Sequence, residues 1–134
     1  MGDLIVPRNV TKAAIGFLKA ELAARSVTAA VGTKQPDGTP NIFVKINRTG
    51  GTRRDKVTDR SQFTVQVEAT DEVVASDVAD LCYALMLYAE ESTVGGIWVR
   101  KVEDVSGPKD FPDPDTDKPR YQFTVRWHTR GQSV

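Results

Sequence analysis

The pattern of apolar and polar side chains within residues 61–106 predicts a strand, a helix and a second strand. The first strand covers residues 61–68, and the second is expected over residues 97–102. The apolar residues that define one face of the first strand are Phe63, Val65 and Val67. If both strands belong to one sheet, a right-handed crossover through the helix lays them parallel.

The segment between these strands has the three- and four-residue spacing of an amphipathic helix. Thr70 is expected to cap this helix, and Asp71 and Glu72 fill its first turn, where exposed amides favour negative charge. The helix should end near Ser92, because Gly95-Gly96 breaks the pattern. Its expected apolar face comprises Val74, Val78, Leu81, Leu85 and Tyr88, widened by Cys82, Met86 and Ala89.

Further elements are predicted on both sides of this unit. Asn9 is expected to cap an earlier helix just after Pro7, with an apolar face made of Val10, Ala14, Phe17, Leu18 and Leu22. Alternation predicts strands at residues 27–32 and 42–47, with a turn at 35–40 between them. The most regular alternation, at residues 121–128, predicts a strand that closes the sheet, followed by a loose tail at 131–134.

Taken together, these elements predict one α+β domain spanning residues 1–134. Its mixed β-sheet has about five strands packed by two helices, in the order α-β-β-β-α-β-β. The length of 134 residues and a hydrophobic content of 40% fit a single domain with a core of its own.

Two polar segments carry opposite charges. Residues 49–59 are too long and polar for a tight hairpin and are expected to project as a loop, and residues 45–60 hold six basic and two acidic side chains. Residues 106–119 contain four prolines, which disfavour a strand ladder and predict an ordered loop. Residues 103–117 hold six acidic side chains and one lysine.

Composition limits the classes of function. The formal net charge is zero, so binding to nucleic acid or an anionic membrane would need a local patch. Cys82 is the single cysteine and lies in a helical apolar stripe, which predicts a buried thiol, no internal disulfide and an intracellular origin. The N-terminus, interrupted early by Pro7, does not resemble a signal peptide, and no stretch approaches a membrane span. We expect a soluble protein made in the cytoplasm.

No set of residues has the spacing of a catalytic, cofactor or metal site. Residues 113–117 have the first acidic positions of a calcium loop, but Lys118 and Thr124 stand where glycine and glutamate are needed. His128 is the sole histidine and is expected to be exposed on a polar strand face. Trp98 and Trp127 are interpreted as core or interface residues. The sequence therefore favours an assembly protein, with no enzyme activity, cofactor or metal.

Several short sequence motifs late in the chain are distinctive. They are Val94-Gly95-Gly96-Ile97-Trp98-Val99, Val105-Ser106-Gly107-Pro108, Pro112-Asp113-Pro114-Asp115-Thr116-Asp117 and Pro119-Arg120-Tyr121, leading into Thr124-Val125-Arg126. In these motifs and in the order of its elements, the chain resembles the tail terminator proteins of long-tailed phages, also called head-tail joining or tail completion proteins. The resemblance is strongest to those of actinobacterial phages. The basic segment around Arg53 and Arg54 departs from that pattern.

The resemblance implies a structural role in a virion tail. A six-membered ring of this protein would sit on the head-proximal end of the tail tube, cap tube polymerisation and offer a surface to the neck. Its partners would be its own copies in a homo-hexamer, the major tail tube protein and a head-completion or neck connector protein. Genomic DNA would pass through the channel, no membrane would be involved, and assembly would take place in the host cytoplasm.

Two surfaces are candidates for the contacts of such a ring. We define the basic arm as Arg48, Arg53, Arg54, Lys56 and Arg60, and the acidic loop as Asp110, Asp113, Asp115 and Asp117. Our hypothesis is that they meet across subunits or face tube and neck respectively, while apolar residues such as Phe43 or Trp98 hold the ring. The alternatives are a head-completion or neck connector protein on the portal side, a small nucleic-acid binder, and an enzyme with a site at a subunit interface.

Overall fold

A six-stranded sheet with the order β2-β3-β4-β7-β6-β5 is the frame of the computed structural model, which describes residues 4–38 and 40–133. The strands are β2 (Ala30–Gly32), β3 (Ile42–Gly50), β4 (Thr58–Ala69), β5 (Ser92–Val94), β6 (Ile97–Asp110) and β7 (Arg120–Arg130). β2 and β3 are parallel, and the other neighbours are antiparallel. The predicted α+β class and mixed sheet are confirmed, with six strands where about five were expected.

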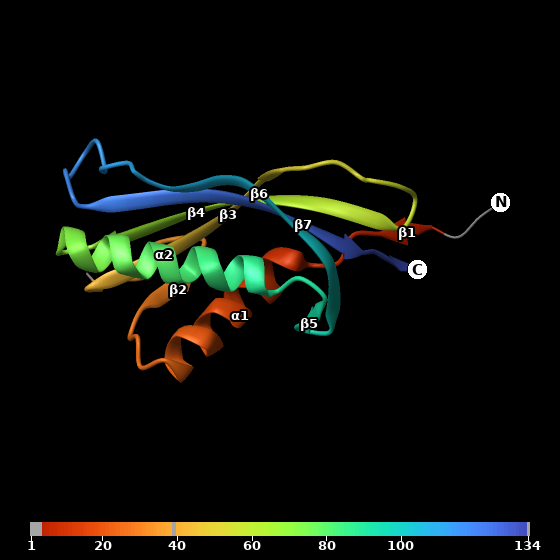
Figure 1. Ribbon diagram of the computed structural model, residues 1–134, viewed down its shortest axis with the longest axis horizontal. Helices are drawn as coiled ribbons and strands as arrows, with labels where there is room; N and C mark the ends of the chain where they lie inside the picture. The colour runs from red at the N-terminus through yellow and green to blue at the C-terminus, as the bar shows by residue number, and fades with distance from the viewer. Residues whose placement is uncertain (1–3, 39, 134) are drawn as a thin grey trace.

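Both helices, α1 (Val10–Ala24) and α2 (Glu72–Tyr88), lie on the same side of this sheet (Figure 1). α1 packs against β2 and β3, and α2 packs against β4, β6 and β7. β4 and β6 contain the two strands predicted before and after the helix, and because β7 is antiparallel to both, they run parallel to each other with β7 between them. The parallel arrangement predicted for these two strands is therefore confirmed.

Trp127 occupies the centre of the core, where it is fully buried. Its indole Nε1 donates a hydrogen bond to the backbone oxygen of Met86 on α2, at 3.1 Å. The rings of Phe17 on α1 and Phe63 on β4 meet it edge to face, with centroids 6.1 and 5.7 Å away. One side chain thus joins both helices to the sheet. Cys82 is buried in this core as expected, and burial raises the pKa of its thiol to about 12.

The first helix forms as the sequence predicts. The side chain of Asn9 accepts a hydrogen bond from the amide of Lys12 at 3.1 Å, which caps α1. Four residues of the predicted apolar face are buried, namely Val10, Ala14, Leu18 and Leu22. Phe17 is partly buried and packs against the core.

The second helix differs from the prediction in its cap and in its rotation. Asp71, rather than Thr70, is the cap, and its Oδ1 accepts hydrogen bonds from the amides of Val73 at 2.7 Å and Val74 at 3.2 Å. Val74 and Tyr88, expected on the apolar face, are 38% and 77% exposed. The buried face consists of Ala75, Val78, Ala79, Cys82, Leu85 and Met86. Small side chains let the helix approach the sheet closely, and a pattern weighted by large residues misses that face.

Gly95-Gly96 forms a hairpin turn, so its interpretation as the stop signal of the helix was wrong. Both glycines have positive φ, at 55° and 79°, the backbone that a two-residue turn between antiparallel strands favours. The turn joins β5 to β6, with Val94 paired to Ile97. The helix has already ended at Tyr88, so β5 is a strand that the sequence did not predict.

β6 continues to Asp110 and so passes through Pro108, in a region where an ordered loop was predicted to begin at Ser106. Its register against β7 shifts between Ser106 and Lys109, so the proline falls in an irregular part of the ladder. Within the described chain, β5 pairs only with residues 97–99, and the outer edge of β6 has no strand neighbour beyond them. The loop between β6 and β7 is therefore confined to residues 111–119.

Three strand predictions also need correction. The expected strand at 27–32 is short, because only Ala30–Gly32 pairs with a neighbour. β7 lies between β4 and β6, in the interior of the sheet, and does not close an edge. In the expected tail, Gln132–Ser133 form β8, which pairs antiparallel with β1 (Ile5–Val6), while Val134 lies outside the described residues. A single strand's pattern indicates its faces and does not identify its neighbours.

Two glycine substitutions test this backbone. Gly51 has φ 113°, and a Cβ there would lie 1.8 Å from the backbone oxygen of Arg60. Gly16 lies within α1, where an added Cβ would meet no neighbouring group within 4 Å. We expect Gly51→Ala to lower the free energy of unfolding by more than ~1 kcal/mol, and Gly16→Ala to raise it by about 0.5–1 kcal/mol. Chemical denaturation measures both, and an unchanged midpoint for Gly51→Ala would contradict the close contact.

Candidate assembly surfaces

The two charged segments lie at opposite ends of the same pair of strands. Thr58 at the start of β4 pairs with Arg130 at the end of β7, and Glu68 near the end of β4 pairs with Arg120 at the start of β7. β4 has 12 residues, so the two loops are separated by roughly 40 Å at about 3.3 Å per residue. Figure 1 shows the loop between β3 and β4 beside β1, and the loop between β6 and β7 at the far end. The chain has no net charge, but its positive and negative charges are separated between the two ends of β4 and β7.

Three residues of the basic arm are engaged within the protein. Arg48 forms an ion pair with the buried carboxylate of Asp59 at 3.0 Å. Arg53 donates to the backbone oxygen of Ile5 at 2.6 Å, which ties the arm to β1. Arg60 donates to the side-chain oxygen of Thr52 at 2.6 Å. These side chains order the arm, so the projecting loop is held against the body of the protein.

An Asx turn at Asp55 shapes the tip of the basic arm. Oδ1 of Asp55 accepts hydrogen bonds from the amides of Val57 at 3.0 Å and Thr58 at 2.8 Å. The first of these bonds is the main reason that the pKa of Asp55 lies below its ordinary value. Arg54 and Lys56 stand exposed beside this turn, and neither side chain forms a hydrogen bond or ion pair with any residue that the structure describes. These two charges are available to a partner.

Arg120 holds the loop at the opposite end. Its guanidinium donates to the backbone oxygen of Phe111 at 3.0 Å and lies 5.2 Å from the centroid of the Phe111 aromatic ring. It also reaches Glu68 at 3.5 Å and Asp113 at 3.9 Å. One planar cation thus fixes the ring of Phe111 and two carboxylates at the base of the acidic loop.

Asp113 differs in role from the other residues of the acidic loop. Its Oδ1 accepts hydrogen bonds from the amides of Asp115 at 2.9 Å and Thr116 at 3.4 Å, and the first of these is the main cause of its lowered pKa. Asp110, Asp115 and Asp117 are exposed. The acidic loop and the basic arm do not meet within one chain, so a contact between them would have to join two copies.

His128 is buried at 4% exposure, which overturns the expectation that it is exposed on a terminal strand. Its Nε2 lies 2.7 Å from Oε1 of Glu103 on β6, and Arg126 donates to the other oxygen of that carboxylate at 2.7 Å. The hydrogen bond with His128 is the main cause of the lowered pKa of Glu103. The sequence could not reveal this because the partner is 25 residues away on a neighbouring strand.

This network belongs to a layer of polar side chains on the helix-free face of the sheet. Arg126 also donates to Gln62 at 2.8 Å, Gln66 donates to Gln122 at 2.9 Å, and Thr64 pairs with Thr124 at 3.5 Å. Cross-strand pairs of this kind fix the register of β4 against β7. This face is therefore polar along the strands between the two charged ends.

Of the two apolar residues considered for ring contacts, Trp98 is 48% exposed and Phe43 is 5% exposed. Phe43 is already covered within the chain, so Trp98 is the better placed of the two for a contact with another molecule. The other tryptophan, Trp127, belongs to the core described above.

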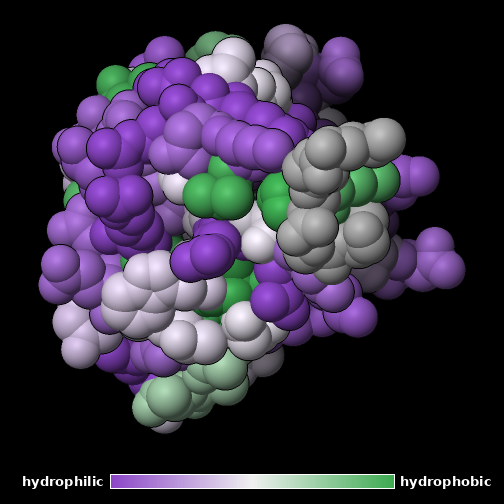
Figure 2. All heavy atoms as spheres, turned by 90° about the vertical axis from the view of Figure 1, so that its right-hand side faces the viewer, coloured by the Kyte–Doolittle hydropathy of each residue, from purple (hydrophilic) through white to green (hydrophobic). Residues whose placement is uncertain are grey.

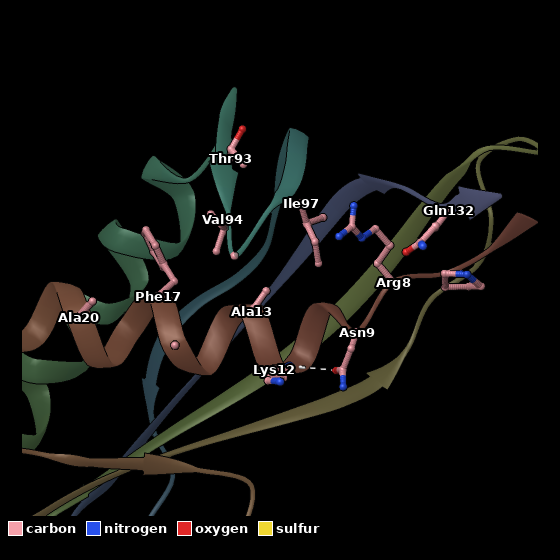
Figure 3. A pocket seen from close by; sticks show the side chains of 13 residues that line it. Arg8, Asn9, Lys12, Ala13, Phe17, Ala20, Thr93, Val94, Ile97 and Gln132 are labelled. Atoms are coloured by element: carbon pink, nitrogen blue, oxygen red, sulfur yellow. Dashed lines mark hydrogen bonds between the residues drawn. The ribbon is translucent and has the colours of Figure 1, made fainter. Parts of the chain in front are cut away.

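A groove of about 710 Å³ opens at the end of the molecule that carries the basic arm. It lies between α1 and the hairpin of β5 and β6, and Figure 3 shows Phe17 and Ala13 of the helix pointing toward Val94 and Ile97 of the hairpin. Arg8 and Lys12 line it near the start of α1. Figure 2 shows this end as mostly hydrophilic, with hydrophobic side chains visible between the hydrophilic ones. No local pattern in the sequence indicates the groove, because its walls come from separate elements.

Metal-binding clusters and membrane-spanning helices are both absent from the described residues. Within residues 4–38 and 40–133, no three His, Cys, Asp or Glu side chains gather closely enough to hold a metal ion. None of the helices in that part of the chain combines the length and apolar character needed to cross a membrane.

The architecture is shared with a protein of known structure. A chain in the virion of a native gene transfer agent (GTA) particle superimposes with a TM-score of 0.68, over 91% of this chain and 95% of that one. The two sequences are 16% identical, so the similarity establishes a common fold. Neither a protein-family model nor a curated protein matches the sequence.

The carboxylates around Arg120 provide a test of the acidic loop. The pKa of Glu68 is raised mainly by burial and, as the second cause, by the hydrogen bond with the neighbouring Asp113. Asp113→Asn keeps a side-chain oxygen for the turn but removes the negative charge. We expect the pKa of Glu68 to fall in this variant and to remain above its ordinary value, because burial persists. Carboxyl chemical shifts followed by NMR during a pH titration measure this change, and an unchanged Glu68 titration would contradict the proximity of the two groups.

Proposed function

We propose that this protein is a structural component of a phage-like virion, and that within the virion it acts as a tail terminator. The observation that carries the proposal is the fold shared over nearly the full length of both chains with a protein of the GTA virion. The more specific proposal, the terminator role, is supported by the sequence motifs between Val94 and Arg126 that resemble those of tail terminator proteins.

A ring-forming subunit needs two different surfaces that complement each other. Such a heterologous contact repeats from copy to copy and closes at a number set by the angle between neighbours. The basic arm and the acidic loop lie at opposite ends of β4 and β7 and have opposite charge. We propose a six-membered ring in which these ends meet across subunits or face the tube and the neck respectively.

In this role the ring caps the head-proximal end of the tail tube and stops its polymerisation. Its outer face then receives the head-completion or neck connector protein, and genomic DNA passes through the channel. Exposed ion pairs contribute about 0–1 kcal/mol each, so they select the orientation of the partners while apolar contacts hold them. The proposal includes no chemical reaction, cofactor or metal ion.

Particles assembled without this protein test the terminator role. We expect tubes of excessive length that are not attached to heads, because nothing ends their polymerisation. Electron microscopy measures the tube length, and complementation with the intact chain is the control. Tubes of normal length beside heads that lack a closing component would contradict the terminator role and favour a neck connector on the portal side.

The unpaired charges of the basic arm provide a second test. Arg54→Glu with Lys56→Glu reverses two exposed charges and leaves Arg53, which holds Ile5, intact. We expect subunit association or tube joining to weaken by up to roughly thirtyfold, since two pairs of up to about 1 kcal/mol each give about 2 kcal/mol and 1.4 kcal/mol is a factor of ten. Analytical ultracentrifugation and tail-joining assays at two salt concentrations measure the effect.

The matched control is Lys19→Glu with Lys34→Glu, which makes the same change of net charge at exposed positions outside the basic arm. It should associate like the unaltered protein. Equal effects of the two double variants would show that total charge matters and that the basic arm has no specific role.

A further inference from the structure

The groove between α1 and the hairpin of β5 and β6 combines an apolar interior with basic residues. Ala13, Phe17, Val94 and Ile97 form its apolar part, and Arg8 and Lys12 lie where α1 begins. Its volume of about 710 Å³ falls within the range of roughly 300–1,000 Å³ that is typical of ligand sites. These properties suit a short segment that carries one large apolar side chain and negative charge.

The far end of the same molecule presents a segment of this kind. Phe111 is 43% exposed and lies between Asp110 and Pro112, close to Asp113. Its backbone amide donates to the carbonyl oxygen of Arg120 at 2.8 Å, and its own carbonyl accepts from the Arg120 guanidinium at 3.0 Å. These bonds hold the backbone of Phe111, and the Arg120 guanidinium 5.2 Å from the ring centroid restrains the ring before any partner arrives, which reduces the entropy lost on binding.

The position of the two features excludes a contact within one copy. The groove shares its end of the molecule with β8, since Gln132 is among its lining residues, whereas Phe111 follows the last residue of β6 at the opposite end. Loop and groove therefore form a complementary pair that can join only two different copies, head to tail. The basic residues of the groove, Arg8 and Lys12, match the negative charge that surrounds Phe111.

We propose that the groove receives the loop of the next copy, with Phe111 inserted between α1 and the β5–β6 hairpin and Asp110 facing Arg8 and Lys12. This inference rests on the proposed ring and identifies the apolar contact that holds neighbouring subunits. A buried aromatic anchor framed by charge is the usual source of binding energy in a protein interface. Phe17, which lines the groove, also packs on Trp127, so the receiving wall is part of the rigid core.

Cysteine trapping tests the contact even when association is weak. One chain carries Pro112→Cys, an exposed position beside Phe111 that leaves the aromatic anchor in place, and the other carries Gly16→Cys, a groove position with open space around it. The native Cys82 is buried in both and stays unreactive. The control replaces Gly16→Cys by Tyr88→Cys, which is 77% exposed and outside the groove.

We expect the disulfide between Pro112→Cys and Gly16→Cys to form at least about tenfold faster than the disulfide with Tyr88→Cys, because docking of Phe111 raises the effective concentration of the two thiols. Non-reducing electrophoresis during mild oxidation measures both rates. Equal rates for the two cysteine pairs would overturn the proposal, because they would show that the loop does not enter the groove.

A competition experiment shows whether the groove itself is responsible. Excess Phe111→Ala chain, which keeps its groove, should slow the cross-link by binding the loop of the Pro112→Cys chain, in which Phe111 is intact. The same competitor with Gly16→Phe added has a filled groove and should not slow it. Phenylalanine is a better helix former than glycine, so this competitor should melt no earlier than Phe111→Ala. Equal competition by both would overturn the groove as the receiving site.

The outcomes separate this inference from the proposed function. Overlong tubes in particles without the protein, together with no preferential cross-link, would leave the terminator role standing and remove the groove contact. Preferential cross-linking together with tubes of normal length would keep the contact and remove the terminator role.

Discussion

The burial of Trp127 is the interaction on which the rest of the structure depends. Its indole contacts Phe17 of α1 and Phe63 of β4 and donates to the backbone of Met86 on α2. The position of α1 relative to the sheet is therefore set by the same side chain that anchors α2. Because Phe17 has Trp127 on one side and the groove on the other, the shape of an external surface is determined by the packing of the core.

The strands β4 and β7 act as a rigid spacer between the two charged ends. Their continuous ladder runs from Thr58 and Arg130 to Glu68 and Arg120, and polar pairs on the helix-free face fix its register. At each end, part of the charge is used internally. Arg48 and Arg53 order one loop and Asp113 orders the other, which leaves Arg54, Lys56 and the remaining aspartates for contacts outside the chain.

Features that depend on neighbouring residues in the sequence could be predicted. The cap at Asn9 and the alternation of Phe123, Val125 and Trp127 are local signals, and the structure confirms them. The burial of His128 depends on Glu103 in another strand, and the rotation of α2 depends on how closely small side chains approach the sheet. The two charged segments were visible as runs of like charge, but their placement at opposite ends needed the strand order. The groove needed the packing of α1 against the hairpin, which no local pattern contains.

Pro108 has a consequence for the protein before it is assembled. A long strand with a free outer edge can recruit strands from other molecules and seed fibres. β6 has such an edge beyond residue 99, but its proline offers no amide hydrogen, and its register is broken on either side of Ser106. Freshly made copies are thereby discouraged from stacking edge to edge while they accumulate. The same irregular stretch leads directly into Asp110 and Phe111, so protection against aggregation and the presentation of a contact surface are encoded in neighbouring residues at the end of β6 and the start of the loop.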